Sequence, residues 1–133
     1  MLLPEQLPTL DQDNARRTAI AAGLSAAFRD LPVKTPPQFP DRAGVYHQYV
    51  LETSPRDGLK SFLEQKGIGT GIYYPVPLHR HEAWKIKKLP AYSLPESERY
   101  SRENLAIPVF AELEDAEVAY IISAVREYFT RGL

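Results

Sequence analysis

The segment of residues 67–79, with the sequence GIGTGIYYPVPLH, limits the fold of this 133-residue chain more than any other part. Three glycines at alternate positions suggest a nucleotide-binding loop, but such a loop follows a strand and opens a helix. Here the order is reversed, because Lys66 and Gly67 are typical of a helix end and residues 70–74 are β-branched or aromatic, as a strand prefers. The segment therefore predicts a helix end followed by a strand, and not a phosphate loop.

Two prolines stiffen the chain that leads from this strand to His79. Pro75 and Pro77 fix their own φ angles and favour extended backbone at the residues that precede them. A stiff turn of this kind holds the histidine at a fixed position and is a candidate ligand surface. An alternative stays open at this point, in which the prolines end an edge strand and Tyr73 or Tyr74 packs in a core.

The composition is that of an ordinary soluble domain. With 44% hydrophobic and 25% charged residues, we expect one domain over residues 1–133 with its own core. The net charge of -1 disfavours nucleic acid and acidic lipid as partners, and the absence of cysteine excludes disulfides and thiolate chemistry. Residues 1–20 carry prolines and charges where a signal peptide or a membrane span needs an apolar run, so we expect a cytoplasmic protein.

A long N-terminal helix is expected over about residues 10–29. Ile20, Leu24 and Phe28 recur every four residues, which is the spacing of one helix face. The stripe is narrow, so the helix is expected to pack on something larger. Exposure of this stripe in the chain would imply a missing partner, because large contiguous apolar surfaces are seldom left free on a monomer.

The clearest helix signal lies just before residues 67–79. Ser54 suits an N-cap, Pro55 suits the first helical position and Asp57 completes a capping box. A polar helix over residues 93–104 and an amphipathic last helix complete the helical signals. We predict an α+β fold with a small, mainly antiparallel sheet of three strands, covered by helices on one face. The expected strands are about residues 45–52, 70–75 and 105–108.

Residue types alone predict no self-contained catalytic centre. His79 and His81 place two imidazoles close together, but a catalytic metal normally needs a third protein ligand, and no HExxH or comparable motif supplies one. A small metal-dependent hydrolase using these histidines is one hypothesis, beside the two functions given below. No serine lies in a GxSxG elbow, and acids such as Glu98 are expected in exposed contexts without a shifted pKa.

The residues 67–79, preceded by Arg56-Asp57-Gly58-Leu59 and by His47-Gln48-Tyr49-Val50, resemble the C-terminal part of the DegT/StrS family of pyridoxal-phosphate-dependent sugar aminotransferases. Residues 103–113 resemble the stretch before the family's last helix, and residues 14–31 resemble its long helix leading into the small domain. The resemblance spans nearly the whole chain and implies the aminotransferase small-domain fold. The chain departs from the family pattern at residues 80–84 and at Ala111, where a proline is usual.

The resemblance implies the C-terminal small domain of a nucleotide-sugar aminotransferase, which moves an amino group from an amino acid to a keto-sugar in polysaccharide or antibiotic sugar biosynthesis. Tyr73, Tyr74 and His79 would help line the substrate side of the cofactor cleft. Family members are about three times longer, and their large domain carries the lysine that binds pyridoxal phosphate. Because every lysine here lies in a segment that matches the small domain, we expect the isolated chain to bind no pyridoxal phosphate and to be inactive.

The resemblance also implies partners. The expected partner is a large aminotransferase domain, in the same or a separate chain, with a nucleotide-sugar substrate in the full enzyme, and family members are homodimers. The alternative function is a stand-alone interaction module that retains the small-domain fold and pairs with a separate large-domain chain. The sequence leaves the sugar, the nucleotide and the amino donor open.

Overall fold

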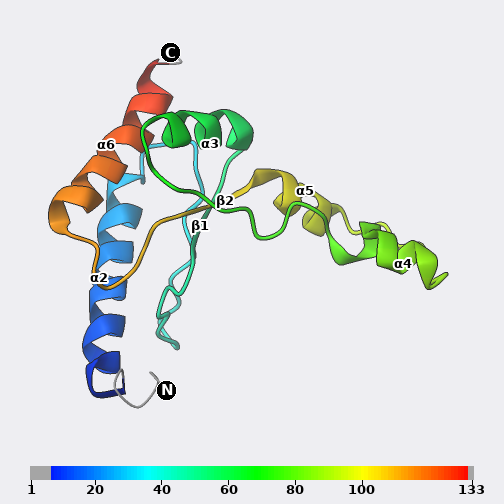
Figure 1. Cartoon of the computed structure of the whole chain (residues 1–133), viewed down its shortest axis with the longest axis horizontal. Helices are drawn as coiled ribbons and strands as arrows, with labels where there is room; N and C mark the ends of the chain where they lie inside the picture. The colour runs from blue at the N-terminus through cyan, green and yellow to red at the C-terminus, as the bar shows by residue number, and fades with distance from the viewer. Residues whose placement is uncertain (1–6, 132–133) are drawn as a thin grey trace.

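A computed structural model describes residues 7–131 and shows helices arranged around a two-stranded sheet (Figure 1). The expected α+β class is confirmed, with a long N-terminal helix. No helix within residues 7–131 combines the length and the apolar character that a bilayer crossing requires. The elements in chain order are η1 (Leu7–Thr9), α2 (Leu10–Ala27), β1 (Tyr49–Glu52), α3 (Arg56–Gln65), η2 (Leu78–Arg80), α4 (Glu82–Ile86), α5 (Pro95–Glu103), β2 (Asn104–Ile107) and α6 (Asp115–Arg131).

Strands β1 and β2 pair antiparallel, with Tyr49 opposite Ile107 and Leu51 opposite Leu105. Along β1, buried side chains alternate with half-buried ones, because successive side chains of a strand point to opposite faces. Every residue of β2 is buried. Strand β2 has a partner on each edge, β1 on one and the chain at Gly71 on the other, and β1 is bridged in turn to Lys34 at Glu52.

The third expected strand, residues 70–75, is reduced to one antiparallel bridge between Gly71 and Ala106. Gly71 N–H donates to Ala106 O at 3.0 Å, and Ala106 N–H donates to Gly71 O at 2.7 Å. The pairing stops there because Tyr73 N–H donates to the side chain of Asn104, at 2.7 Å, and the prolines that follow have no N–H. The segment therefore lies at the edge of β2 without forming a regular strand.

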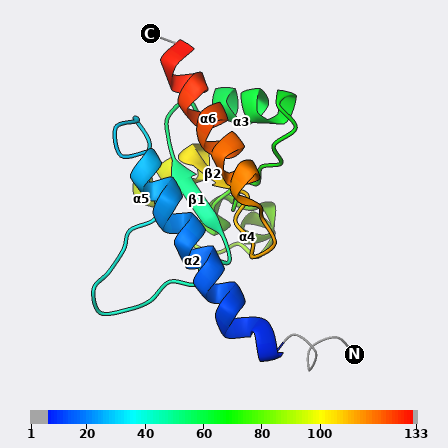
Figure 2. The ribbon, with the colours of Figure 1, turned by 90° about the vertical axis from the view of Figure 1, so that its left-hand side faces the viewer.

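Helix α2 enters the core through the expected stripe. Ile20, Leu24 and Phe28 are 3%, 0% and 0% exposed, respectively. Helix α6 contacts α2, and the two helices lie side by side on one side of the sheet (Figures 1 and 2). Because the stripe is buried within this chain, it does not imply a missing partner, and the stand-alone module loses the observation that would have favoured it.

The carboxyl end of α2 is closed by a side chain from α6. Arg126 donates to Ala27 O at 2.6 Å and to both carboxylate oxygens of Asp30 at 2.8 Å. These hydrogen bonds hold the pKa of Asp30 at about 2, below its ordinary value of 3.8. A cation at a helix C-terminus also suits the helix dipole. The core that these contacts enclose further includes Leu59, Leu63, Val109, Leu113, Ile121, Ala124 and Val125.

Helix α3 begins at Arg56, one residue later than the sequence predicted. The N-cap position is Pro55, which makes no side-chain capping hydrogen bond, so the expected cap at Ser54 is not formed. Asp57 instead pairs with Arg56 at 2.6 Å. The predicted end is confirmed, because Gly67 closes the helix with a φ of 75°, a conformation that glycine adopts without steric cost.

Between Gly71 and β2 the chain leaves the core. Residues 73–103, here called the arm, carry η2, α4 and α5 and project from the sheet on the side away from α2 and α6 (Figure 1). Helix α5 packs against β1, whereas side chains farther out remain exposed, as at Leu78 (81%) and Ile86 (72%). The arm is therefore attached to the sheet at its base and open to solvent along its length.

Candidate functional site

A groove of about 1190 Å³ runs along the arm. Its walls are α4, α5 and the turn that holds Pro75 and Pro77, here called the proline turn. The three residues that the resemblance singled out, Tyr73, Tyr74 and His79, all line the groove. The groove offers apolar and aromatic surface with polar atoms at a few points, as ligand sites commonly do. Its other aromatic side chains are Trp84, Tyr92 and Tyr100.

The two tyrosines lie on the groove and not in the core. Tyr73 is 39% exposed and Tyr74 is 73% exposed, and their rings meet edge-on with centroids 5.8 Å apart. The Tyr73 ring folds back over Gly71, where an added Cβ would lie 2.8 Å from its hydroxyl oxygen. Glycine at this position therefore permits the close approach that places Tyr73 at the groove. The alternative of core packing does not hold for either ring.

Asn104 fixes the backbone of the proline turn to the base of the arm. Its side chain is fully buried; Oδ1 accepts from Tyr73 N–H and Nδ2 donates to Tyr100 O, each at 2.7 Å. Arg56 Nη1 donates to the Asn104 carbonyl at 3.1 Å. One side chain thus joins the turn to α5, and its backbone joins both to α3. Residue types did not predict this role, although an asparagine at the start of an apolar strand is an unusual choice.

His79 is held by a carboxylate from α5. The His79 side chain is 4% exposed, and Nε2 lies 2.9 Å from Oε1 of Glu98. The same oxygen accepts hydrogen bonds from Nε of Arg80 at 3.2 Å and from Nη2 at 2.9 Å. The contacts with His79 and then Arg80 lower the pKa of Glu98 from 4.5 to about 2. The expectation that Glu98 lies in an exposed context without a shifted pKa was therefore wrong.

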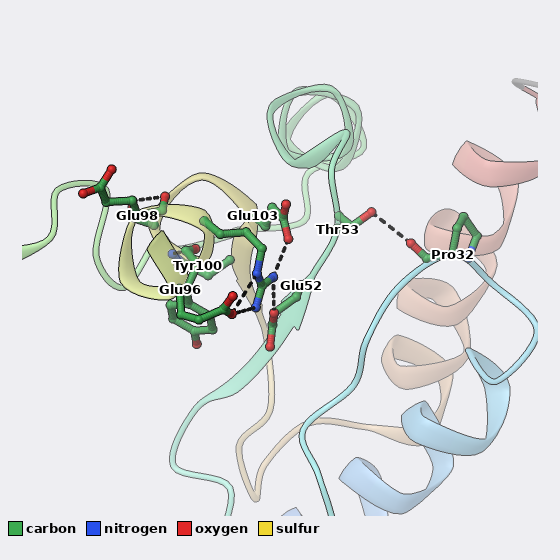
Figure 3. Close-up of polar contacts among 10 residues, drawn as sticks. Pro32, Glu52, Thr53, Glu96, Glu98, Tyr100 and Glu103 are labelled. Carbon is green, nitrogen blue, oxygen red and sulfur yellow. Dashed lines mark hydrogen bonds and ion pairs between the residues drawn. The ribbon is translucent and has the colours of Figure 1, made fainter. Parts of the chain in front are cut away.

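A second ionic cluster fastens α5 to the sheet. Figure 3 shows Glu52, Glu96 and Glu103 converging between α5 and β1. The group they surround is the Arg99 guanidinium, at 2.7 Å from Glu52, 2.6 Å from Glu103 and 3.2 Å from Glu96. These hydrogen bonds, with Glu52 foremost, raise the pKa of Arg99. Because Arg99 also lines the groove, the cluster anchors the α5 wall on β1.

Among the described residues, the groove contains no metal ligand set and no cofactor lysine. Within residues 7–131, no three His, Cys, Asp or Glu side chains are placed to hold a metal ion, so the hydrolase hypothesis has no support. A Schiff-base cofactor needs a lysine amine, and no lysine of the described part of the chain lines the groove. Lys66 pairs with Glu127 at 2.7 Å, and Lys60 pairs with Glu64. The groove residues therefore do not by themselves fit pyridoxal phosphate, and we assign no chemical step to this chain.

Known proteins resemble this chain in sequence. Residues 1–126 match the model of the DegT/DnrJ/EryC1/StrS aminotransferase family. A dTDP-3-amino-3,4,6-trideoxy-alpha-D-glucose transaminase of Streptomyces venezuelae is 37% identical over 127 residues, which are 95% of this chain and 34% of the relative. A dTDP-3-amino-3,6-dideoxy-alpha-D-galactopyranose transaminase of Aneurinibacillus thermoaerophilus is 30% identical over 127 residues, 96% of this chain and 34% of the relative.

Solved structures share the fold. S. venezuelae DesV, in complex with a ketimine intermediate, matches with a TM-score of 0.89 at 37% identity. A DegT DnrJ EryC1 StrS aminotransferase from Brucella abortus matches with a TM-score of 0.87 at 33% identity. In both cases 96% of this chain and 34% of the other are covered, so the chain spans about a third of the length of these relatives. Because the family model covers residues 1–126, the chain belongs to the DegT/DnrJ/EryC1/StrS aminotransferase family, which is pyridoxal-phosphate-dependent.

Proposed function

We propose that this chain is the C-terminal small domain of a cytoplasmic, pyridoxal-phosphate-dependent nucleotide-sugar aminotransferase. It works with a large aminotransferase domain, in the same or a separate chain, which supplies the cofactor lysine. The observation that carries the proposal is an aromatic groove that no lysine of the described residues lines, on a chain that matches about a third of the length of a known sugar transaminase. Such a groove is suited to cover a cofactor cleft and to bind substrate, and not to react alone.

Tyr73, Tyr74 and His79 form the substrate-facing part of the groove in this proposal. The two tyrosines present aromatic surface and phenol groups, whereas His79 is buried enough to be held in one orientation. The names of both transaminases above describe dTDP-linked amino sugars, which supports a nucleotide sugar as the substrate class. The amino group would come from an amino acid and pass to a keto-sugar.

The exposed arm indicates where the remainder of the enzyme packs. Large contiguous apolar patches are uncommon on free monomers and usually mark an interface or a ligand site. We expect the large domain to cover the arm and to complete the groove, within a homodimer as in the family. The exposed apolar side chains of the arm are Tyr73, Tyr74, Val76, Leu78, Ile86, Leu89, Tyr92 and Leu94, which are 39–81% exposed.

A complementation assay tests this proposal. The chain is supplied with the two thirds of the S. venezuelae relative that it does not match, once as a fusion and once as a separate chain. We expect the chain alone to show neither aldimine absorbance nor amino-sugar product, and the fusion to restore both. Restoration with separate chains as well would support the alternative module that pairs with a separate large-domain chain.

A matched pair of variants reports whether the groove is the substrate site. Tyr74→Ala removes an exposed ring of the groove, and Tyr120→Ala removes a 50% exposed ring of α6 outside it. We expect Tyr74→Ala to raise the KM for the nucleotide sugar and Tyr120→Ala to leave it unchanged. Equal kinetics of the two variants, or turnover by the isolated chain, would contradict the proposed function.

A further inference from the structure

The hydrogen-bond partners of Glu98 determine which ring nitrogen of His79 carries a hydrogen. Two N–H groups of Arg80 donate to Oε1 of Glu98 at 3.2 and 2.9 Å, and ring nitrogen Nε2 of His79 lies 2.9 Å from the same oxygen. The pKa of Glu98 lies at about 2, so the carboxyl group is ionised at neutral pH and can only accept. Nε2 of His79 must therefore be the donor, and it carries a hydrogen whether the ring is neutral or charged.

The second ring nitrogen of His79 has a different surrounding. Nδ1 makes no hydrogen bond to any residue in the described range 7–131, where Glu98 is the partner of the ring. The buried side-chain atoms of this range that lack a hydrogen bond are Arg56 Nε and Thr70 Oγ1. Nδ1 is not one of them, so it is in contact with solvent. His79 lines the groove, so a molecule bound there is the candidate partner of this nitrogen.

We propose that Glu98 is a positioning residue that fixes neutral His79 as the Nε2–H tautomer and leaves Nδ1 as a hydrogen-bond acceptor for the groove. A ligand that contacts this nitrogen must bring a donor. A sugar hydroxyl or an amine fits this requirement, whereas a phosphate oxygen does not. The identity of the ligand rests on the proposed function, but the tautomer of His79 is a property of this chain alone.

The fold holds Glu98 firmly enough for this role. Glu98 lies in the first half of α5, where its N–H donates to Leu94 O at 3.0 Å and its carbonyl accepts from the Ser101 hydroxyl at 2.9 Å. The next residue, Arg99, ties the helix to β1 through Glu52. The Glu98 side chain is 24% exposed, so solvent competes only in part for the carboxylate. The carboxylate is thus placed by a helix that is itself fixed to the sheet.

Nitrogen-15 NMR of the imidazoles in the whole chain tests the proposal. Spectra are recorded at an alkaline pH where the histidine shifts no longer change, so that only neutral tautomers contribute. We expect His79 to be almost entirely Nε2–H in the wild type, and Glu98→Gln to lower its Nε2–H to Nδ1–H ratio about tenfold or more, because a charge-assisted hydrogen bond is lost. Glu98→Asp, which keeps the charge, should retain the preference at least in part.

Matched controls separate positioning from a general structural effect. Glu96→Gln removes a carboxylate of the same helix that pairs with Arg99 and not with His79, so its His79 spectrum should equal that of the wild type. His47 and His81 are exposed and serve as references in each spectrum. The proposal is overturned if wild-type His79 is mainly Nδ1–H, if folded Glu98→Gln keeps the wild-type ratio, or if Glu96→Gln shifts it equally. The wild-type spectrum decides the first point even if Glu98→Gln does not fold.

Discussion

Replacing Asn104 with alanine is expected to lower the free energy of unfolding by about 2–5 kcal/mol. The side chain is 0% exposed and pairs with two backbone groups, Tyr73 N–H and Tyr100 C=O, each at 2.7 Å. A buried donor or acceptor left without a partner costs about 1–3 kcal/mol, and here two lose their partner together. The hydrogen bond from Tyr73 N–H is only part-buried, so water can partly replace it, and the expected loss is smaller than the full cost of two buried groups without partners.

Urea unfolding of the chain, followed by circular dichroism, measures this loss. Asn14→Ala is the matched control, because the chain's other asparagine lies on α2 and its carboxamide accepts from Arg17 at 2.9 Å near the surface. That control is expected to change the stability by no more than about 0.5 kcal/mol. Hydrogen exchange adds a local readout, since the Tyr73 amide should exchange faster in Asn104→Ala.

The comparison has a clear negative outcome. A loss below about 1 kcal/mol in Asn104→Ala, or one equal to that of Asn14→Ala, would show that both backbone groups find other partners. An unchanged exchange rate at the Tyr73 amide would lead to the same conclusion. The role of Asn104 as the anchor of the proline turn would then be refuted.

Two further predictions concern glycine and acid. Gly67→Ala should destabilise the chain by about 1 kcal/mol, because the φ of Gly67 is 75°. Gly23→Ala, in an open position on α2, should stabilise the chain by about 0.5–1 kcal/mol. Melting temperatures of the two variants that move in the same direction would contradict this reasoning. The pKa of Glu98 is about 2 in the folded chain against 4.5 as its ordinary value, so its stabilising contribution is complete above 4.5 and is lost as the pH falls toward 2. Glu98→Gln should therefore flatten the stability curve between these values; a slope as steep as that of Glu96→Gln would contradict it.

Local signals predicted the helices better than the sheet. A positive φ at Gly67 and a proline at the start of α5 act within one helical turn, so the sequence shows both directly. Residues 70–75 have strand composition, yet they pair only at Gly71, because Asn104 takes the next backbone N–H from 31 residues away. A side chain so distant in sequence leaves no trace in a local pattern.

The same distinction applies to the groove. Tyr73, Tyr74 and His79 were predicted together because they lie in one stiff segment, and all three line the groove. Glu98 was not predicted, since its partner His79 is 19 residues away and only the packing of α5 brings them together. Its sequence neighbour Arg99 depends on packing in the same way, because its partner Glu52 lies on β1.

Helix α5 transmits the position of the sheet to the proline turn. Arg99 joins it to β1, Glu98 joins it to His79, and Asn104 at its end joins it to Tyr73. By contrast, α4 is held through Trp84, whose Nε1 donates to Pro90 O at 2.8 Å within the arm itself. One wall of the groove is therefore fixed to the core and the other is not.

This asymmetry explains where substrate differences are expected within the family. Residues 80–84, where the sequence resemblance predicts a departure from the family pattern, span the end of η2 and the start of α4. Arg80 donates hydrogen bonds to Glu98 of α5, but changes at residues 81–84 alter the groove without disturbing the hydrogen bonds of α5. Changes in α5 would also disturb the sheet and the turn. We therefore expect the α5 wall to set the position of His79 and the α4 wall to discriminate between sugars.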